Sequence, residues 1–499
     1  MTTHEIRDIL NIGIEITTEK NKNRLLEKML EEFRPCFSRK AAFRWFVVVV
    51  VGFMLRSDQL GVTSMIRDLA LAPGGYESLI HFFRSDAWDA GAVRRKWYHA
   101  LLKFAPLLKI KGRVILAGDG VKQSKEGCRM PGVKRLVQES EDSSKPQYIF
   151  GHMYGAVGVL IGTLERHFCL PLKINIQDGL KAASAWDGSD VSPESHIVQV
   201  IENAFEASRV LGRSILLLDR YFLTTSALRK QAELNAAYGS PDHVTIVTKA
   251  KSNYVAYRKP APKAPGAKGR PRLKGDTVKL SELLNDDSRY RKAQALLYGR
   301  RKEISYFYED LLWGQKLYQE MRFVFVKYDG MKSIFVCTDL TIDPVRIAEL
   351  YGFRFNIERC FREFKQQLGG FCYHFWTKHM PRLNHYAKKG DRDPLARVAD
   401  KEDQKAILDT VKAIEGFVLF SSIAMGILQM LSLMVTDNRF HGGRYLRTQP
   451  ENGDSEATVM SYMRRNIFLM FLKYPDSFVT RFIREKQTGK SGNIRDGVA

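Results

Sequence analysis

Residues 214–220 have the sequence SILLLDR, a short apolar run that ends in an acid. An uninterrupted run of this kind is typical of a strand buried in the middle of a sheet. Residues 113–120, RVILAGDG, repeat the pattern earlier in the chain. Hydrophobic patterning predicts further strands at 148–161, 165–176 and 243–249 and helices at 193–211 and 222–235. This succession of strands and helices predicts a mixed α/β layer.

Two acids directly follow the predicted buried strands. Asp119 comes after RVILAG and Asp219 after SILLL. Ligands and metals usually collect at the carboxyl ends of strands in α/β sheets, which makes both aspartates candidate functional residues. Either one taken singly could instead serve a turn or cap a helix.

A third acid, Glu358, lies within a long helix that we predict from about residue 344 to 368. At 100° per residue, Tyr351, Arg354, Glu358 and Lys365 share an arc of about 60°. The adjacent arc is apolar and would be the packing face. A carboxylate set between two cations and a phenol suits a metal-binding acid among phosphate-binding side chains. The alternative is a solvated face on which Arg354 and Glu358 form an i,i+4 ion pair.

The charge of the chain indicates a polyanionic partner. The 499 residues contain 78 Lys and Arg against 55 Asp and Glu, a formal net charge of +23. Such an excess on a globular chain most often serves nucleic-acid binding. Residues 249–302 are the most basic part, and the Pro-rich segment 258–274 within them predicts an exposed loop. That loop is either a solvated connector or a site of phosphate contact.

The composition also bears on the compartment. The six cysteines form no Cys-x-x-Cys pair, which predicts reduced thiols in a cytosolic protein rather than disulfides or a zinc site. We see no signal peptide at the N-terminus. Residues 416–435 carry no charge and are long enough to span a bilayer. The serines and the glutamine within this stretch favour a buried core helix instead, and we expect no membrane contact.

The spacing Tyr351-x2-Arg354-x3-Glu358-x6-Lys365 resembles the Tyr-Arg-Glu-Lys signature of the DDE transposases of bacterial insertion sequences. Asp119 and Asp219 stand where that family has its two aspartates. The resemblance implies an α/β, ribonuclease-H-like catalytic core at 106–250 and 333–385, interrupted by a basic, mainly β insertion at 251–332. It also implies a helical DNA-binding region at 1–105 and a helical, possibly dimerising region at 386–499.

The resemblance implies a mechanism as well. Asp119, Asp219 and Glu358 would hold two Mg²⁺ ions, for which Mn²⁺ can substitute, and the ions would serve DNA cleavage and strand transfer. Tyr351, Arg354, Lys365 and Arg220 would contact DNA phosphates. The partners would be double-stranded DNA, namely terminal inverted repeats and target DNA, and a second copy of the chain. The expected location is the bacterial cytoplasm, at the nucleoid.

Three functions compete at this point. The first is a cut-and-paste transposase, and the second is a metal-dependent nuclease without strand transfer. The third is a catalytically inactive or regulatory DNA-binding protein derived from a transposase, against which the complete set of three acids argues. His374 and His379 follow the glutamate helix, and we expect them to be structural or DNA-side residues, because Mg²⁺ seldom binds imidazole.

Overall fold

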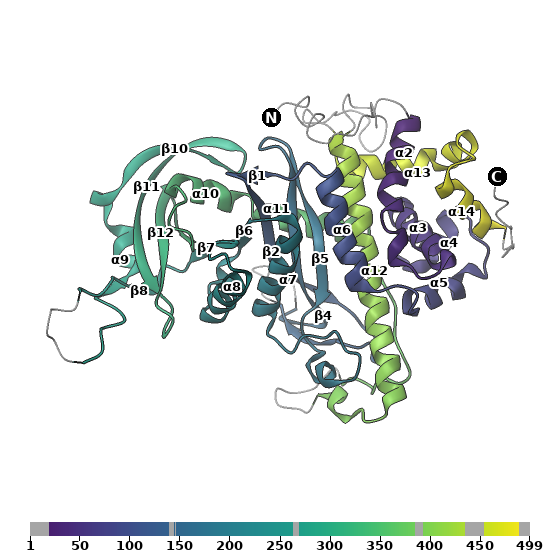
Figure 1. Ribbon diagram of the computed structural model, residues 1–499, viewed down its shortest axis with the longest axis horizontal. Helices are drawn as coiled ribbons and strands as arrows, with labels where there is room; N and C mark the ends of the chain where they lie inside the picture. Colours follow the sequence, from purple (N-terminus) through teal and green to yellow (C-terminus); the bar gives the residue numbers. More distant parts are fainter. Residues whose placement is uncertain are drawn as a thin grey trace.

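The computed structural model describes residues 19–138, 144, 146–262, 269–384, 393–434 and 454–488. Its helices are α2 (Glu19–Glu31), α3 (Lys40–Leu55), α4 (Val62–Asp68), α5 (Gly75–Arg84), α6 (Ala90–Phe104), α7 (His196–Leu211), α8 (Thr225–Tyr238), α9 (Leu280–Asn285), α10 (Pro344–Gly352), α11 (Phe355–Gln366), α12 (Lys401–Met434), α13 (Glu456–Lys473) and α14 (Phe478–Gln487). Its strands are β1 (Lys109–Ile110), β2 (Arg113–Ser124), β3 (Lys134–Val137), β4 (Tyr148–Gly162), β5 (His167–Ile176), β6 (Ser214–Leu218), β7 (Val244–Ala250), β8 (Val255–Tyr257), β9 (Thr277–Lys279), β10 (Arg291–Leu297), β11 (Arg300–Trp313), β12 (Gln319–Tyr328) and β13 (Met331–Cys337). Figure 1 shows a helical part built from both ends of the chain, a central sheet, and a β-rich part on the far side of that sheet.

The described strands form one 13-stranded sheet, whose longest path is β3-β4-β2-β6-β7-β13-β12-β11-β8-β9. In its centre, β2, β6 and β7 run parallel, and β4 pairs antiparallel with β2 on one side and β5 on the other. All five residues of β6 are buried, as the SILLL run predicts. The predicted α/β fold is thus confirmed as a mixed sheet with helices, which is consistent with a ribonuclease-H-like fold.

The strand that carries Asp119 is longer than we predict. β2 does not end at Gly118 but continues to Ser124. The reason is non-local: β4 is 15 residues long and pairs with β2 as far as Ser124 opposite Gly151. The parallel pairing with β6 does end at Gly118. Asp119 therefore lies one residue past the end of the parallel pairing with β6 but within the antiparallel pairing with β4.

The predicted β insertion continues the core sheet. β13 pairs antiparallel with β7, and β12, β11 and β8 follow in order. Within this part, β10 and β11 are two strands joined by a turn at Tyr298 and Gly299. Both turn residues have positive φ, +52° and +77°, as a two-residue hairpin with a matching twist requires. The division of the chain into functional domains stays a prediction.

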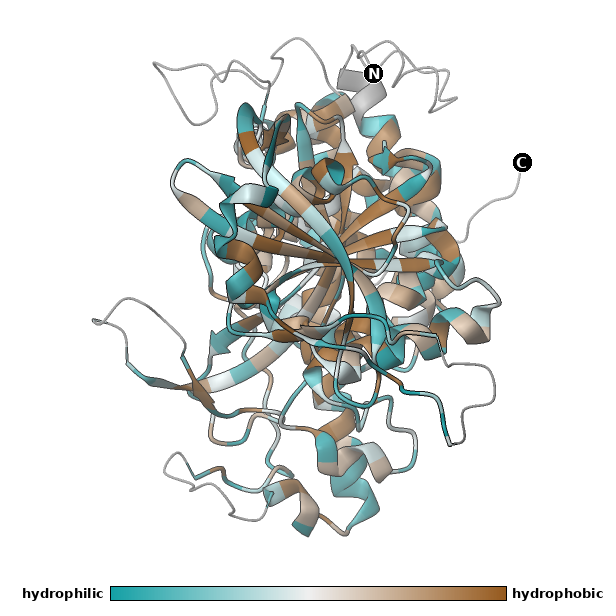
Figure 2. Cartoon of the chain, turned by 90° about the vertical axis from the view of Figure 1, so that its left-hand side faces the viewer, coloured by the Kyte–Doolittle hydropathy of each residue, from teal (hydrophilic) through white to brown (hydrophobic). Residues whose placement is uncertain are grey.

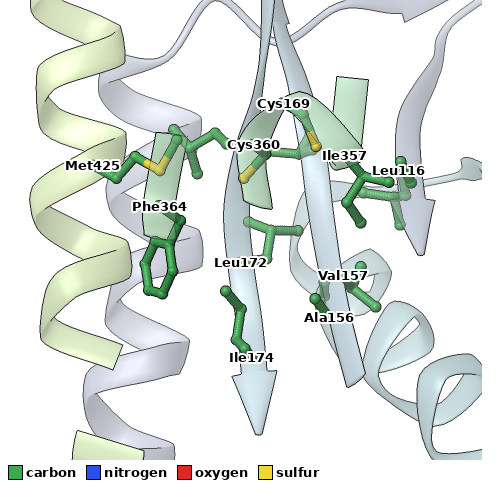
Figure 3. Packing of buried hydrophobic residues seen from close by; sticks show 14 of the residues in the cluster. Leu116, Ala156, Val157, Cys169, Leu172, Ile174, Ile357, Cys360, Phe364 and Met425 are labelled. Carbon is green, nitrogen blue, oxygen red and sulfur yellow. The ribbon is translucent and has the colours of Figure 1, made fainter. Parts of the chain in front are cut away.

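Helices cover both faces of the central sheet. α7 packs against β4, β2, β6 and β7, and α11 packs against β2 and β5. Ile357, Cys360 and Phe364 of α11 lie against β5, with Met425 of α12 beside them (Figure 3). Seen along the sheet, the strands in the interior are mostly hydrophobic and the outer loops hydrophilic (Figure 2). This apolar layer leaves the opposite face of α11 free to carry polar groups.

Helices from the two ends of the chain pack into one helical part. α3 contacts α12, α13 and α14, and Arg44 of α3 forms an ion pair with Glu485 of α14 at 2.7 Å. Within the described residues, α12 is the one helix long and apolar enough to cross a membrane, and its apolar window is completely buried in the protein. This burial agrees with the predicted core helix.

Candidate active site

The register of two parallel strands brings Asp119 and Asp219 to one place. Gly118 of β2 lies opposite Leu218 of β6, and an aspartate directly follows each. Successive side chains of a strand point to opposite faces. A Cβ on Gly118 would meet Val200 of α7 at 2.9 Å, so Asp119 points away from α7, toward the face that α11 covers.

The helix predicted over 344–368 is in fact two helices. α10 ends at Gly352, and tight turns with i→i−3 hydrogen bonds follow, from Arg354 N to Tyr351 O (3.0 Å) and from Ile357 N to Arg354 O (3.1 Å). The expectation of one continuous helix, and with it an arc shared by all four residues, is therefore wrong. Tyr351 belongs to α10, while Glu358 and Lys365 lie on α11 with Arg354 at its start.

Tyr351 and Arg354 nevertheless meet the acids. The Tyr351 hydroxyl donates to Asp219 Oδ1 at 3.3 Å. Arg354 donates through Nη1 to Asp119 Oδ2 at 3.2 Å and through Nη2 to Glu358 Oε1. The i,i+4 ion pair between Arg354 and Glu358, considered above as part of a solvated face, does form. This face is not solvated, however, because the Arg354 side chain is only 13% exposed and also contacts Asp119. Arg354 thus joins Asp119 to Glu358, and its guanidinium lies 5.9 Å from the centre of the ring of Tyr351, which contacts Asp219.

Burial and the neighbouring charges act on Asp119 in opposite directions. Burial raises the pKa of the Asp119 carboxyl to about 6, and the charges of Asp219 and Glu358 add to the rise. The charge of Arg354 and the Gly120 amide, which donates to Oδ1 at 2.7 Å, oppose it. The pKa of Asp119 is therefore raised mainly because the carboxyl is buried, and only in a smaller part because the other two acids repel its charge.

Burial and neighbouring groups together set the protonation of Tyr351 and Arg354. It raises the pKa of Tyr351 above its ordinary value, so the phenol keeps its proton and donates to Asp219. Burial alone would lower the pKa of Arg354, but the surrounding Tyr351, Asp119 and Glu358 raise it. Arg354 is therefore a permanent cation here.

Further cations surround the acids. Lys365 donates to the Lys122 carbonyl at 3.1 Å, and burial lowers its pKa. Arg220 is exposed beside Asp219. Lys249, which the sequence reasoning missed, lies at the end of β7 with its Nζ 4.9 Å from the centre of the Tyr351 ring. Burial and the charge of Arg354 lower the pKa of Lys249.

A pocket of about 250 Å³ opens beside Asp219. Tyr298, from the turn between β10 and β11, forms one wall, and Lys249 and Phe355 line it as well. Sequence reasoning did not find Tyr298, although a Tyr-Gly pair between two strand-like runs signals a turn. The β-rich part thus contributes a side chain to the edge where the acids lie.

The donor set of this site suits a hard cation. Asp119, Asp219 and Glu358 offer only carboxylate oxygens, which favour Mg²⁺ or Mn²⁺. As the side chains stand, no group of three acidic, Cys or His residues in the described part of the chain is close enough to hold a metal ion. Arg354 interacts with two of the three acids. The chemistry of the residues therefore fits a metal, provided that Arg354 withdraws.

Two other predictions lie outside this site. His379 contacts Asp403 of α12 at 2.5 Å, in agreement with a structural role, while His374 is exposed. Of the predicted basic loop, residues 263–268 are outside the described residues. The adjoining Arg258 and Lys259 form ion pairs with Glu309 and Glu320, at 3.3 and 2.7 Å.

The comparisons with known proteins identify the family. A model of the DDE superfamily endonuclease family matches residues 32–302, more than half of the chain. The match includes Asp119 and Asp219 but stops before Tyr351, so it does not test the Tyr-Arg-Glu-Lys signature. No curated protein and no solved structure matches the chain significantly. On the length of the matched segment, the chain belongs to the DDE superfamily of endonucleases.

Proposed function

We propose that the protein is a DNA transposase of an insertion sequence, which binds terminal inverted repeats and moves them by a cut-and-paste route. The main support is the meeting of Asp119, Asp219 and Glu358, which come from three distant segments and are connected through Tyr351 and Arg354. Membership of an endonuclease family and the net charge of +23 also support a DNA substrate.

The three acids would hold two Mg²⁺ ions. Bound divalent ions would activate the attacking oxygen and stabilise the leaving oxygen of an in-line displacement at phosphorus. The protein itself supplies the carboxylate oxygens. The Tyr351 hydroxyl orients the Asp219 carboxylate through its hydrogen bond.

The cations around the acids would hold the DNA backbone. Arg220 and Lys249 line the pocket beside Asp219, and Lys365 contacts the Lys122 carbonyl on the strand that carries Asp119. Arg and Lys are the usual phosphate binders. Arg354 would exchange a carboxylate for a phosphate when it leaves the acids. Helices from both chain ends would bind the transposon end and a second copy of the chain.

Strand cleavage and joining by the full-length protein test this proposal. The substrate is duplex DNA that carries the element's own terminal repeats, with Mg²⁺ or EDTA. Asp119→Asn, Asp219→Asn and Glu358→Gln should each abolish cleavage and leave DNA binding intact. Asp187→Asn is the control, since that side chain is 85% exposed.

Each outcome distinguishes the candidate functions. Cleavage followed by joining supports the transposase, and cleavage without joining supports a nuclease. Binding without either supports a regulatory DNA-binding protein. Strand transfer by any one of the three acid variants would refute the assignment. DNA affinity should also fall steeply with salt, because phosphate contacts release counterions.

A further inference from the structure

An extended segment after α11 presents a row of aromatic and basic side chains to solvent. Burial alternates along residues 371–378 with the period of a strand. The inward side chains are Phe371, Tyr373, Phe375 and Thr377. The outward ones include His374, Trp376 and Lys378. Trp376 is 57% exposed, which is unusual for so large an apolar side chain.

This row borders a basic pocket. The pocket has a volume of about 740 Å³ and lies between the chain just after β2 and the segment that carries Trp376. Lys125, Arg129 and Arg382 line it, against one carboxylate, Glu126. No carboxylate in the described part of the chain forms an ion pair with any of these three cations. The pocket therefore has positive charge available for an anion.

The cations also hold the pocket in shape. Lys125 Nζ donates to the Phe371 and Tyr373 carbonyls, at 2.5 and 3.0 Å. Arg129 Nη1 donates to the Lys378 carbonyl at 2.5 Å and to the Met380 carbonyl at 3.1 Å. Lys125 Nζ also lies 3.7 Å from the centre of the Tyr373 ring. Arg129, with five donors, retains N–H groups for a ligand. These residues tie the two walls of the pocket together.

A buried polar network fixes the segment from beneath. The Tyr373 hydroxyl lies 2.5 Å from His152 Nδ1 and 2.5 Å from the Tyr154 hydroxyl, and His152 Nε2 lies 2.7 Å from the Pro131 carbonyl. All three side chains are fully buried. Arg84 of α5 also donates to the Trp376 carbonyl at 3.1 Å. The indole is thus presented by a rigid support, as a binding platform requires.

We propose that this pocket binds an unpaired nucleotide, whose base stacks on Trp376 and whose phosphates meet Lys125, Arg129 and Arg382. An exposed aromatic ring within a basic groove is the arrangement that binds single-stranded nucleic acid. The charged rim argues against an apolar protein partner. The assignment rests on the proposed DNA substrate and adds the class of DNA structure that the protein recognises.

The pocket is within reach of the candidate active site. β2 carries Asp119 and ends at Ser124, five residues or about 17 Å further along an extended strand. Lys365 contacts Lys122 midway along this path. A strand that leaves the acids along β2 would therefore pass the half-buried Lys365 and reach the pocket that Ser124 and Trp376 line.

Binding of a short oligothymidine, compared with a blunt duplex, tests the proposal. The full-length protein is titrated in EDTA so that cleavage does not interfere. Trp376→Ala should weaken single-strand binding by about 5- to 150-fold and change duplex binding little. Trp376→Phe should retain most of the affinity, because a phenyl ring can still stack. The matched control is Tyr238→Ala, an aromatic side chain 47% exposed on α8.

Tryptophan fluorescence gives a second measurement that does not need the alanine variant to fold. The oligothymidine should quench the parent protein, and Trp376→Phe should lose the part of the quenching that stacking causes. The pocket assignment is overturned if Trp376→Ala binds the single strand as tightly as the parent, or if quenching is as strong in Trp376→Phe as in the parent. Cleavage would still support the transposase in that case. A parent that binds neither form of DNA overturns both proposals.

Discussion

Replacing Asp119 by asparagine should stabilise the metal-free protein at neutral pH. The Asp119 side chain is 22% exposed, and its pKa is raised to about 6 from 3.8, chiefly by burial. The asparagine would keep the shape of the side chain and an oxygen for the Gly120 amide. It would not carry the charge that burial disfavours. Catalytic acids often reduce stability in this way.

The size of the effect follows from linkage. A carboxyl with a raised pKa binds its proton more tightly in the folded state, so its favourable contribution is present below about pH 4 and is lost as pH rises through about 6. The interval from 3.8 to about 6 corresponds to about 3 kcal/mol. Above pH 6 the variant should therefore exceed the parent by up to about 3 kcal/mol.

Chemical denaturation in EDTA at several pH values measures the difference. The variant and the parent should differ most above pH 6 and converge near pH 4. Mg²⁺ should then raise the free energy of unfolding of the parent more than that of the variant. The variant Asp276→Asn, at an exposed side chain, controls for the substitution itself. A variant that is less stable than the parent at high pH, or a difference that does not change with pH, would refute the reasoning.

Three further changes probe the same edge of the sheet. Tyr351→Phe removes one hydrogen bond to a carboxylate and should slow cleavage about 12- to 150-fold in a kinetic assay. Gly118→Ala places a Cβ 2.8 Å from a Leu218 methyl and should lower the free energy of unfolding by about 1–3 kcal/mol, whereas Gly74→Ala, with no atom within 4 Å, should not. Arg354→Gln should remove the mutual strengthening of divalent-cation and DNA binding, measured by DNA titration with and without Ca²⁺. Unchanged coupling would contradict this last expectation.

Local patterns predicted much of the central sheet. β6 matches the SILLL run residue for residue, because a run buried on both faces needs no partner to be recognised. The core helix within α12 was also expected. Asp119 and Asp219 were proposed as site residues on the same pattern, since each directly follows a buried run.

Structural features that depend on residues far away in the sequence could not be predicted. The extension of β2 through Asp119 requires the long β4, which is not evident from the sequence around residue 119. The break between α10 and α11 was also not predicted, because the helix propensity of Phe353 is ordinary and gives no sign that the helix ends there. Lys249 reaches the acids only through the parallel pairing of β6 and β7, which patterning cannot specify.

The contacts of Arg354 are the reason to expect that cation and DNA binding are coupled. Its guanidinium is only 13% exposed and joins Asp119 to Glu358, so it neutralises part of the charge that divalent ions would neutralise in its place. The same carboxylate oxygens cannot serve both, so Arg354 must leave the acids when they hold metal. The guanidinium of Arg354, once it has left the acids, can bind a phosphate. A bound phosphate in turn keeps Arg354 away from the acids. Coupling free energies are reciprocal, so each ligand should tighten the other by the same factor. Glutamine has no charge to exchange between carboxylate and phosphate, and that factor should disappear with it.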